Sequence, residues 1–156
     1  SKAIATAVEL GLELGQLFLT HTHLDHIIDR AAVEAHNEDL RTYVNALEPA
    51  ERATRFQPGD CFTVGGLKIS TRLTKGHSPG GITYVIEGLE RPVAIAGDAL
   101  FAQSMGGGMI SDQDALATNR SELFTLADHT VICPGHGPMT SVGEEKAHNP
   151  FYPEFK

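Results

Sequence analysis

Three histidines and an aspartate lie within the six residues 21–26, which read HTHLDH. Imidazole nitrogens and carboxylate oxygens are ligands that borderline divalent ions such as Zn²⁺ take. Without a cation, so many titratable groups in one short segment would crowd like charges together. The segment therefore predicts a metal site.

Three more potential ligands follow along the chain, each beside a glycine. They are His77 in GHSPGG, Asp98 in GD and His136 in GHG. Glycine lets the backbone turn sharply and come close to a bound species. The other histidines of the chain lack such a setting, and we interpret them as surface or hydrogen-bonded residues: His36, His129 and His148.

Apolar runs that predict β-strands precede each of these groups. The runs cover residues 16–20, 67–74, 92–96 and 130–133. Because strand ends at one edge of an α/β sheet gather in space, we expect the polar side chains to share one pocket. The set is His21, His23, Asp25, His26, His77, Asp98 and His136. These ligands are too many for one tetrahedral ion, so two divalent ions fit better.

Further elements complete an alternating α/β pattern. Apolar spacing predicts an amphipathic helix over residues 3–15 and a mostly polar helix over 31–47. Residues 61–74 read as two strands joined by a turn at Gly65 and Gly66, and GITYVI reads as another strand. A later helix is expected to begin at Ser111 as its N-cap.

Composition limits the function classes. A chain of 156 residues with 41% hydrophobic and 21% charged residues describes one globular domain. A net charge of −8 leaves no basic stripe, so nucleic acid is not an expected partner. No apolar run reaches the roughly 18 residues of a membrane span, and no signal peptide is recognisable, so the expected location is cytoplasmic. Cys61 and Cys133 are expected to be reduced and mostly buried.

The motifs resemble those of a known family. HTHLDH resembles the His-x-His-x-Asp-His motif of the metallo-β-lactamase-fold hydrolases, and GHSPGG, GDALF and CPGHGPMT follow in that family's order. Together with EEKAHNPF near the end, they look most like the short bacterial glyoxalase II type, which hydrolyses glutathione thioesters. The resemblance extends from Leu17 to the C-terminus.

The resemblance implies a fold and a ligand assignment. The fold is an α/β domain, the metallo-β-lactamase αββα sandwich, expected over residues 1–156 as a single domain. His21, His23 and His77 are implied to hold one metal and Asp25, His26 and His136 the other, with Asp98 bridging both. Zinc is the expected metal, with iron or manganese as alternatives. Asp25 and Asp98 are thereby implied to be catalytic, because two cations would lower the pKa of a shared water from about 16 towards about 7.

Two departures from the family pattern stand out. The N-terminal sheet that usually precedes the opening helix is missing, so we expect the domain to be incomplete there. The segment between residues 26 and 58 is also compact for the family, which leaves open whether stretches are missing within it. FAQSMGGGM, residues 101–109, replaces a loop that often carries an arginine near the metals.

Several functions remain open at this point. The leading one is hydrolysis of a small-molecule thioester or ester, with a glutathione conjugate as one candidate, no membrane partner and oligomerisation left open. The same fold also holds lactone or ester hydrolases, and persulfide dioxygenases that are implied to use one iron at His21, His77 and Asp98. The last alternative is a metal-binding module without catalysis.

Overall fold

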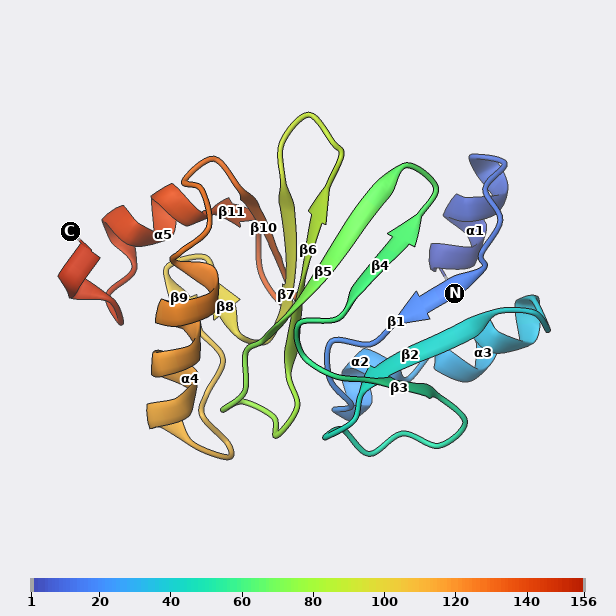
Figure 1. Cartoon of the computed structure of the whole chain (residues 1–156), viewed down its shortest axis with the longest axis horizontal. Coiled ribbons are helices and arrows are strands. Elements are labelled where there is room, and N and C mark those ends of the chain that lie inside the picture. Colours follow the sequence, from blue (N-terminus) through green and yellow to red (C-terminus); the bar gives the residue numbers. More distant parts are fainter. Residues whose placement is uncertain (1, 156) are drawn as a thin grey trace.

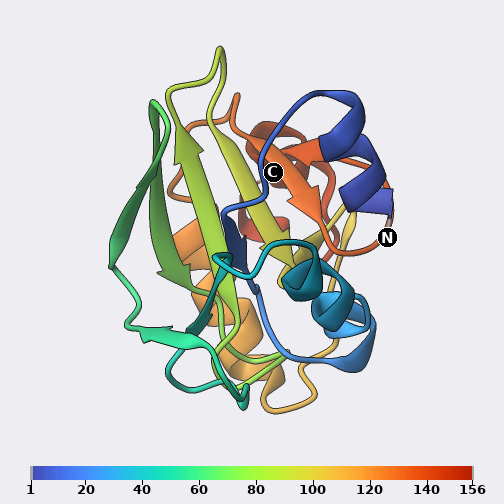
Figure 2. The same ribbon diagram turned by 90° about the vertical axis from the view of Figure 1, so that its right-hand side faces the viewer.

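The computed structural model describes residues 2–155. Two β-sheets face each other at its centre, with helices on both outer sides (Figure 1). Helices α1, α2 and α3 lie on the side of the smaller sheet, and α4 and α5 lie on the side of the larger one (Figures 1 and 2). The expected αββα sandwich is therefore confirmed.

The smaller sheet has three parallel strands in the order β1-β2-β3. The larger sheet has six strands in the order β11-β10-β7-β6-β5-β4, and β8 and β9 form a separate pair. The strands are β1 (Gln16–Phe18), β2 (Arg41–Asn45), β3 (Thr54–Phe56), β4 (Cys61–Val64), β5 (Leu67–Leu73), β6 (Ile82–Glu87), β7 (Val93–Gly97), β8 (Leu100–Phe101), β9 (Ser104–Met105), β10 (Val131–Pro134) and β11 (Thr140–Ser141). The helices are α1 (Lys2–Glu9), α2 (Leu24–Ile27), α3 (Arg30–His36), α4 (Asp112–Thr118), the π-helical η1 (Asn119–Leu123), α5 (Val142–His148) and the 3₁₀ turn η2 (Pro153–Phe155).

Aromatic and branched apolar side chains fill the space between the two sheets. Phe56, Ile69, Ile82 and Tyr84 are buried there. Phe18 of β1 packs in the same layer, with its ring 5.5 Å from that of Tyr84. The Tyr84 hydroxyl donates a 2.6 Å hydrogen bond to the Leu19 carbonyl, which joins the larger sheet to the end of β1. Leu19 is two residues before His21, so this hydrogen bond holds the chain in place next to the first potential ligand.

A second core lies between the larger sheet and the C-terminal helices. It contains Ala94, Leu123, Phe124, Ile132, Val142 and Tyr152, among others. The two cores together hold the ends of β1, β7 and β10 in fixed positions, and these are three of the four strand ends that precede the potential ligands.

Most of the predicted strands and the predicted cap are confirmed. The hairpin of β4 and β5 turns at Gly65 and Gly66 as expected, and the pairing is antiparallel. The Ser111 side chain accepts a hydrogen bond from the backbone N–H of Asp114 at the start of α4.

The prediction of one polar helix over residues 31–47 is wrong. Helix α3 ends at His36, and β2 follows from Arg41. Thr42, Val44 and Asn45 are buried, and β2 pairs on both sides with β1 and β3. Pairing within the sheet thus overrides the local helical pattern.

Two smaller expectations also need correction. The opening helix ends at Glu9 rather than Gly15, and a positive φ of 63° at Gly11 follows it. Cys61 is exposed and Cys133 half-buried, so the expectation that the thiols are mostly buried is wrong, although both are free. Between residues 2 and 155, no helix combines the length and the apolar character needed to cross a membrane.

Candidate metal centre

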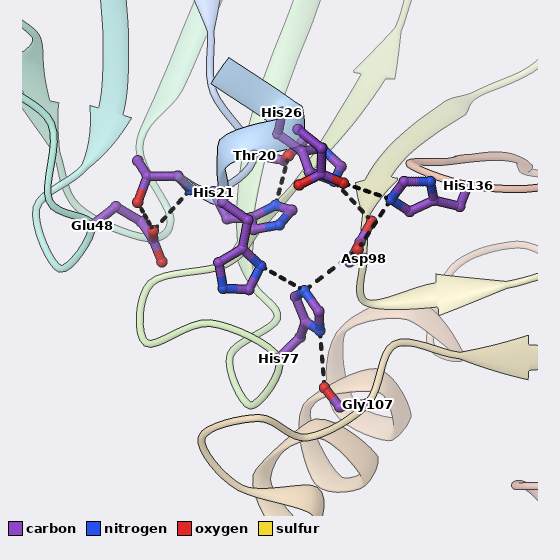
Figure 3. Close-up of polar contacts among 11 residues, drawn as sticks. Thr20, His21, His26, Glu48, His77, Asp98, Gly107 and His136 are labelled. Carbon is purple, nitrogen blue, oxygen red and sulfur yellow. Dashed lines mark hydrogen bonds and ion pairs between the residues drawn. The ribbon is translucent and has the colours of Figure 1, made fainter. Parts of the chain in front are cut away.

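The structure brings all seven predicted ligands together at one edge of the sandwich (Figure 3). They come from the segment after β1, from α2, from the β5–β6 loop, and from the residues after β7 and β10. They form three groups in which the potential ligand atoms lie within 4.8 Å of one another. The groups are His21 with His23 and His77, His21 with His26 and Asp98, and Asp25 with His26 and His136.

Asp98 lies between the two sides of this cluster. Its Oδ1 is 3.2 Å from His26 Nε2, and its Oδ2 is 3.4 Å from His77 Nε2 and 3.6 Å from His136 Nε2. On one side, His77 Nε2 is 2.9 Å from His23 Nδ1. On the other side, His136 Nε2 is 3.1 Å from Asp25 Oδ2. One carboxylate therefore contacts histidines from both groups.

Buried polar atoms without partners show that the cluster fits a bound cation. His21 Nε2 is buried and has no hydrogen-bond partner among the described residues, and the buried His26 Nε2 and Asp98 Oδ1 face each other at 3.2 Å without forming a hydrogen bond. Leaving such atoms unpaired costs about 1 to 3 kcal/mol each. Imidazole nitrogens and carboxylate oxygens are suitable donors for divalent first-row metals. Metal ions coordinated here would remove that cost.

Burial and neighbouring histidines prepare His21 to act as a ligand. Burial lowers the pKa of His21, and the positive charges of His26, His23 and His77 lower it further, to about 3. The imidazole is therefore neutral at physiological pH, which is the form that binds a metal. Burial raises the pKa of Asp25, but its backbone hydrogen bond together with His26 and His136 outweighs this effect and holds that pKa below its ordinary value.

Hydrogen bonds from outside the cluster orient two of the ligands. Thr20 Oγ1 lies 3.2 Å from His21 Nδ1, and the Gly107 carbonyl lies 2.9 Å from His77 Nδ1. Such contacts fix the ring orientation and the nitrogen that faces a metal. The sequence suggests Thr20 for this role, together with Thr22, Ser78 and Asp29. No hydrogen bond joins those last three side chains to a ligand. The sequence does not indicate the contact of Gly107, because every residue has a backbone carbonyl and its position depends on the fold.

Glu48 ties two ligand-bearing loops together, and sequence reasoning missed it (Figure 3). Its Oε2 accepts hydrogen bonds from the backbone N–H and the hydroxyl of Thr22, at 3.0 and 2.7 Å. Its Oε1 accepts a 2.8 Å bond from the backbone N–H of Gly80. Burial raises the pKa of Glu48, but the hydrogen bonds, that of Thr22 foremost, outweigh it and leave the pKa below its ordinary value. The charged carboxylate thus joins the loop of His21 and His23 to the loop of His77.

A glycine beside His136 has no room for a side chain. A Cβ at Gly135 would lie 2.3 Å from Asp98 Oδ1 and 2.6 Å from His26 Cε1. The GHG motif is therefore explained at this position by close approach of the backbone to the cluster.

Known proteins share both the sequence and the fold. None of the known family models matches the chain. The probable metallo-hydrolase YqgX of Bacillus subtilis is 32% identical, with 92% of this chain and 78% of the relative aligned. The hydroxyacylglutathione hydrolase GloC of Haemophilus influenzae is 31% identical over the same shares of the two chains. This chain belongs to the metallo-β-lactamase-fold metallo-hydrolases. The family predicted from HTHLDH and the motifs that follow it is thus confirmed.

Solved structures of this superfamily superpose on nearly all of the chain. The B3 metallo-β-lactamase BLEG-1 gives a TM-score of 0.85 at 29% identity, covering 97% of this chain and 83% of that one. ETHE1 from Myxococcus xanthus gives 0.84 at 28% identity, covering 96% and 67%. TTHA1623 in a di-iron-bound form gives 0.76 at 26% identity, covering 96% and 83%.

The superfamily includes more than one chemistry. Human persulfide dioxygenase ETHE1 is 29% identical to this chain over 91% of its length, which spans 58% of ETHE1. Relatives at about 30% identity therefore include both a hydroxyacylglutathione hydrolase and a persulfide dioxygenase.

Proposed function

We propose that the protein is a hydrolase of thioesters and related esters that uses two divalent metal ions. The observation that carries this proposal is the position of Asp98, whose two oxygens face histidines of both ligand groups. In this assignment His21, His23 and His77 hold one ion, Asp25, His26 and His136 hold the other, and Asp98 contacts both. Zinc is the proposed metal, within one catalytic domain over residues 1–156.

The bound ions would supply a water of lowered pKa and polarise the carbonyl of the substrate. The protein's own residues hold the geometry. Glu48, Thr20 and the Gly107 carbonyl fix the loops and the ring orientations before substrate arrives. Asp98 is buried, so its charge is little screened by solvent. His136 and Asp25 are exposed, which places the open side of the cluster next to these two residues.

Similarity to a named hydrolase supports the substrate class. GloC is named a hydroxyacylglutathione hydrolase and aligns with 92% of this chain. A small-molecule thioester is therefore the proposed substrate, and the proposed location is the cytoplasm.

A second function is favoured by the likeness to ETHE1. The Myxococcus xanthus protein superposes with a TM-score of 0.84, close to that of the B3 enzyme. A dioxygenase would require iron and oxygen consumption, and one ion held by His21, His77 and Asp98 would leave Asp25, His26 and His136 without a metal.

Elemental analysis combined with an activity assay separates the two functions. The protein is purified without added metal, its metals are counted, and hydrolysis of S-D-lactoylglutathione and of simple acyl thioesters is measured. We expect about two zinc ions per chain and thiol release. One iron per chain, with oxygen consumption on a persulfide and no thiol release from the thioesters, would favour the dioxygenase instead.

A further inference from the structure

A short loop of three glycines, residues 106–108, supports His77 from outside the metal cluster (Figure 3). The Gly107 carbonyl lies 2.9 Å from His77 Nδ1. Because a carbonyl oxygen only accepts hydrogen bonds, Nδ1 carries the proton and donates. The other ring nitrogen, Nε2, then keeps the lone pair that a metal requires, and it lies 3.4 Å from Asp98 Oδ2. The position of this carbonyl therefore selects the form of His77 that binds metal.

Side-chain packing contributes little to the position of the Gly107 carbonyl. Gly106 lies tightly against Asp98, since a Cβ there would be 1.8 Å from the Asp98 carbonyl oxygen, but a Cβ on Gly107 would meet nothing within 4 Å. Fixing a glycine also costs more conformational freedom than fixing any other residue. Behind these two glycines lies a cavity of about 330 Å³, whose other walls are Met105, Asp112, Leu116 and Phe151. Hydrogen bonds must therefore hold this part of the loop in place.

Asp112, the first residue of α4, supplies a hydrogen bond from outside the loop. Its Oδ1 accepts from the Gly108 N–H at 2.9 Å. A Cβ on Gly108 would lie 2.3 Å from the Asp112 backbone nitrogen, so glycine is needed for this close approach. The Met109 N–H also donates to the Gly107 carbonyl, but that bond lies within the same segment and moves with it. The contact with Asp112 thus attaches the loop to a helix.

The start of α4 is a suitable anchor, because it is fixed to the segment that carries His77. The Gly76 carbonyl accepts from the N–H groups of Ile110 and Ser111, at 2.9 and 3.1 Å. A carboxylate at Asp112 is therefore held at a constant position relative to the imidazole that the loop supports.

The Asp112 carboxylate has no competing ionic partner. Among residues 2–155, no lysine, arginine or histidine side chain pairs with it, whereas Asp114 in the same turn pairs with Lys75 at 3.1 Å. The Gly108 N–H is the polar group that this carboxylate is placed to bind.

We propose that Asp112 is a positioning residue of the metal site, although it is not itself a ligand. By accepting from Gly108, it keeps the Gly107 carbonyl on His77 Nδ1, and so keeps His77 Nε2 directed at the first ion. Outer contacts of this kind fix the orientation of a metal-bound histidine. The inference rests on the proposed function and adds to its metal centre a residue outside the seven ligands and their motifs.

The zinc affinities of Asp112→Ala and Asp112→Asn test this role. Both variants lose the charge, but asparagine keeps an acceptor oxygen for the Gly108 N–H. In competition with a chelator of known affinity, Asp112→Ala should hold one of the two zinc ions about tenfold more weakly, at the lower end of the range for residues that orient ligands. Asp112→Asn should bind both ions like the wild type. Equal weakening in the two variants, or none in Asp112→Ala, would overturn the proposal.

Two neighbouring glycines test the same contact from its other partner. A Cβ on Gly108 would collide with Asp112, whereas one on Gly107 would meet open space, and neither glycine has a positive φ. Gly108→Ala should therefore weaken the same ion, and Gly107→Ala should leave its affinity unchanged. Equal losses in these two variants would show that any stiffening of the loop has the same effect, and would overturn the role of Asp112.

Asp114→Ala is the control for the start of the helix. It removes a carboxylate from the same turn, together with the pair to Lys75, without touching the glycine loop. It should spare metal affinity. A loss as large as that in Asp112→Ala would trace the effect to the helix as a whole and overturn the proposal.

The imidazole of His77 gives a measurement other than affinity. In the zinc-loaded protein its Nδ1 proton is bonded to the Gly107 carbonyl and should exchange slowly with water, which isotope-edited NMR measures. Asp112→Ala should speed this exchange, and Asp112→Asn should not. Slow exchange that persists in Asp112→Ala would contradict the proposal.

Failure of the proposed function and failure of this inference are distinguishable, because His77 is a ligand in both metal assignments. If the wild type holds one iron at His21, His77 and Asp98, the hydrolase fails, and the same variants are compared by iron affinity. Weaker iron binding in Asp112→Ala than in Asp112→Asn would then support the positioning role, and equal binding would overturn it. If two zinc ions and thioester hydrolysis are found but Asp112→Ala binds zinc like the wild type, the positioning role alone fails.

Discussion

At the scale of single residues, the metal cluster depends on a few side chains that have no alternative partners. Among the described residues the buried His21 Nε2 has no hydrogen-bond partner, and the Asp98 carboxylate faces only other potential ligands, His26, His77 and His136. The types and spacing of the seven ligands allowed their proximity to be predicted from the sequence. The contribution of Glu48 could not be predicted, because its three hydrogen bonds reach residues far from it in the chain.

Asp98→Asn is expected to remove most hydrolysis while leaving the fold intact. An amide carries no charge and offers only one acceptor oxygen, so it cannot hold two cations at one spacing. We expect kcat to fall about a hundredfold or more, and metal content to drop below two per chain. The unfolding midpoint should change little. Wild-type turnover with both metals retained would rule out the bridging role.

Glu48→Gln should weaken metal binding without removing a ligand. The amide nitrogen of glutamine would face a backbone or hydroxyl donor that the carboxylate accepts from, so the loops of His21 and His77 would separate. Metal affinity is expected to fall about 10- to 100-fold, as for other residues that orient ligands. Competition with a chelator of known affinity measures this.

Glu145→Gln is the control for that change. Glu145 is equally buried and accepts from Thr140, Gln103 and Asn149, but it contacts neither Thr22 nor Gly80. The Glu145→Gln substitution should lower the free energy of unfolding and leave metal affinity unchanged. Equal loss of affinity in both variants would show that Glu48 acts only through general stability.

At the scale of elements, the site is assembled by contacts between loops and helices. Gly76 has a φ of 126°, and its carbonyl accepts from the N–H groups of Ile110 and Ser111 at the start of α4. The β5–β6 loop that carries His77 is therefore attached to α4. The strands before the ligands were predictable because their apolar residues are either consecutive, as in β7 and β10, or spaced regularly between polar ones, as in β5. Strand β2 was not, because its conformation is set by pairing with β1 and β3.

Gly76→Ala should disrupt this attachment. A Cβ there would lie 2.3 Å from the Ala115 backbone nitrogen, and the positive φ is unfavourable for alanine. We expect the free energy of unfolding to fall by more than about 1 kcal/mol, measured in denaturant. Gly66→Ala, where nothing lies within 4 Å, should have a much smaller effect. Similar losses in the two variants would argue against the contact with α4.

At the scale of the whole molecule, two buried tyrosines connect the layers. Tyr84 joins the larger sheet to Leu19, and the Tyr152 hydroxyl accepts from the Asn119 side chain at 2.7 Å within the C-terminal core. Burial raises the pKa of both phenols above the ordinary value of 10. These contacts join residues far apart in the sequence and help to fix how the layers pack. The local sequence around either tyrosine does not predict them.

Alkaline pH is expected to destabilise the protein through these tyrosines. Well below pH 10 both phenols are protonated in the folded and the unfolded state, so they make the free energy of unfolding neither rise nor fall with pH. Above pH 10 the unfolded chain loses protons that the folded protein retains, so the free energy of unfolding falls as pH rises. Denaturant titrations across this range should show a smaller decline for Tyr84→Phe, whereas Tyr43→Phe should keep it. An unchanged decline in Tyr84→Phe would contradict this account.

The number and position of the bound metals test the central claim most directly. Anomalous X-ray diffraction from crystals of the metal-loaded protein locates each ion by element. The account predicts two ions about 3.5 to 4 Å apart, with Asp98 between them. One ion should contact His21, His23 and His77, and the other Asp25, His26 and His136. A single ion at His21, His77 and Asp98 in fully loaded protein would contradict the two-metal hydrolase.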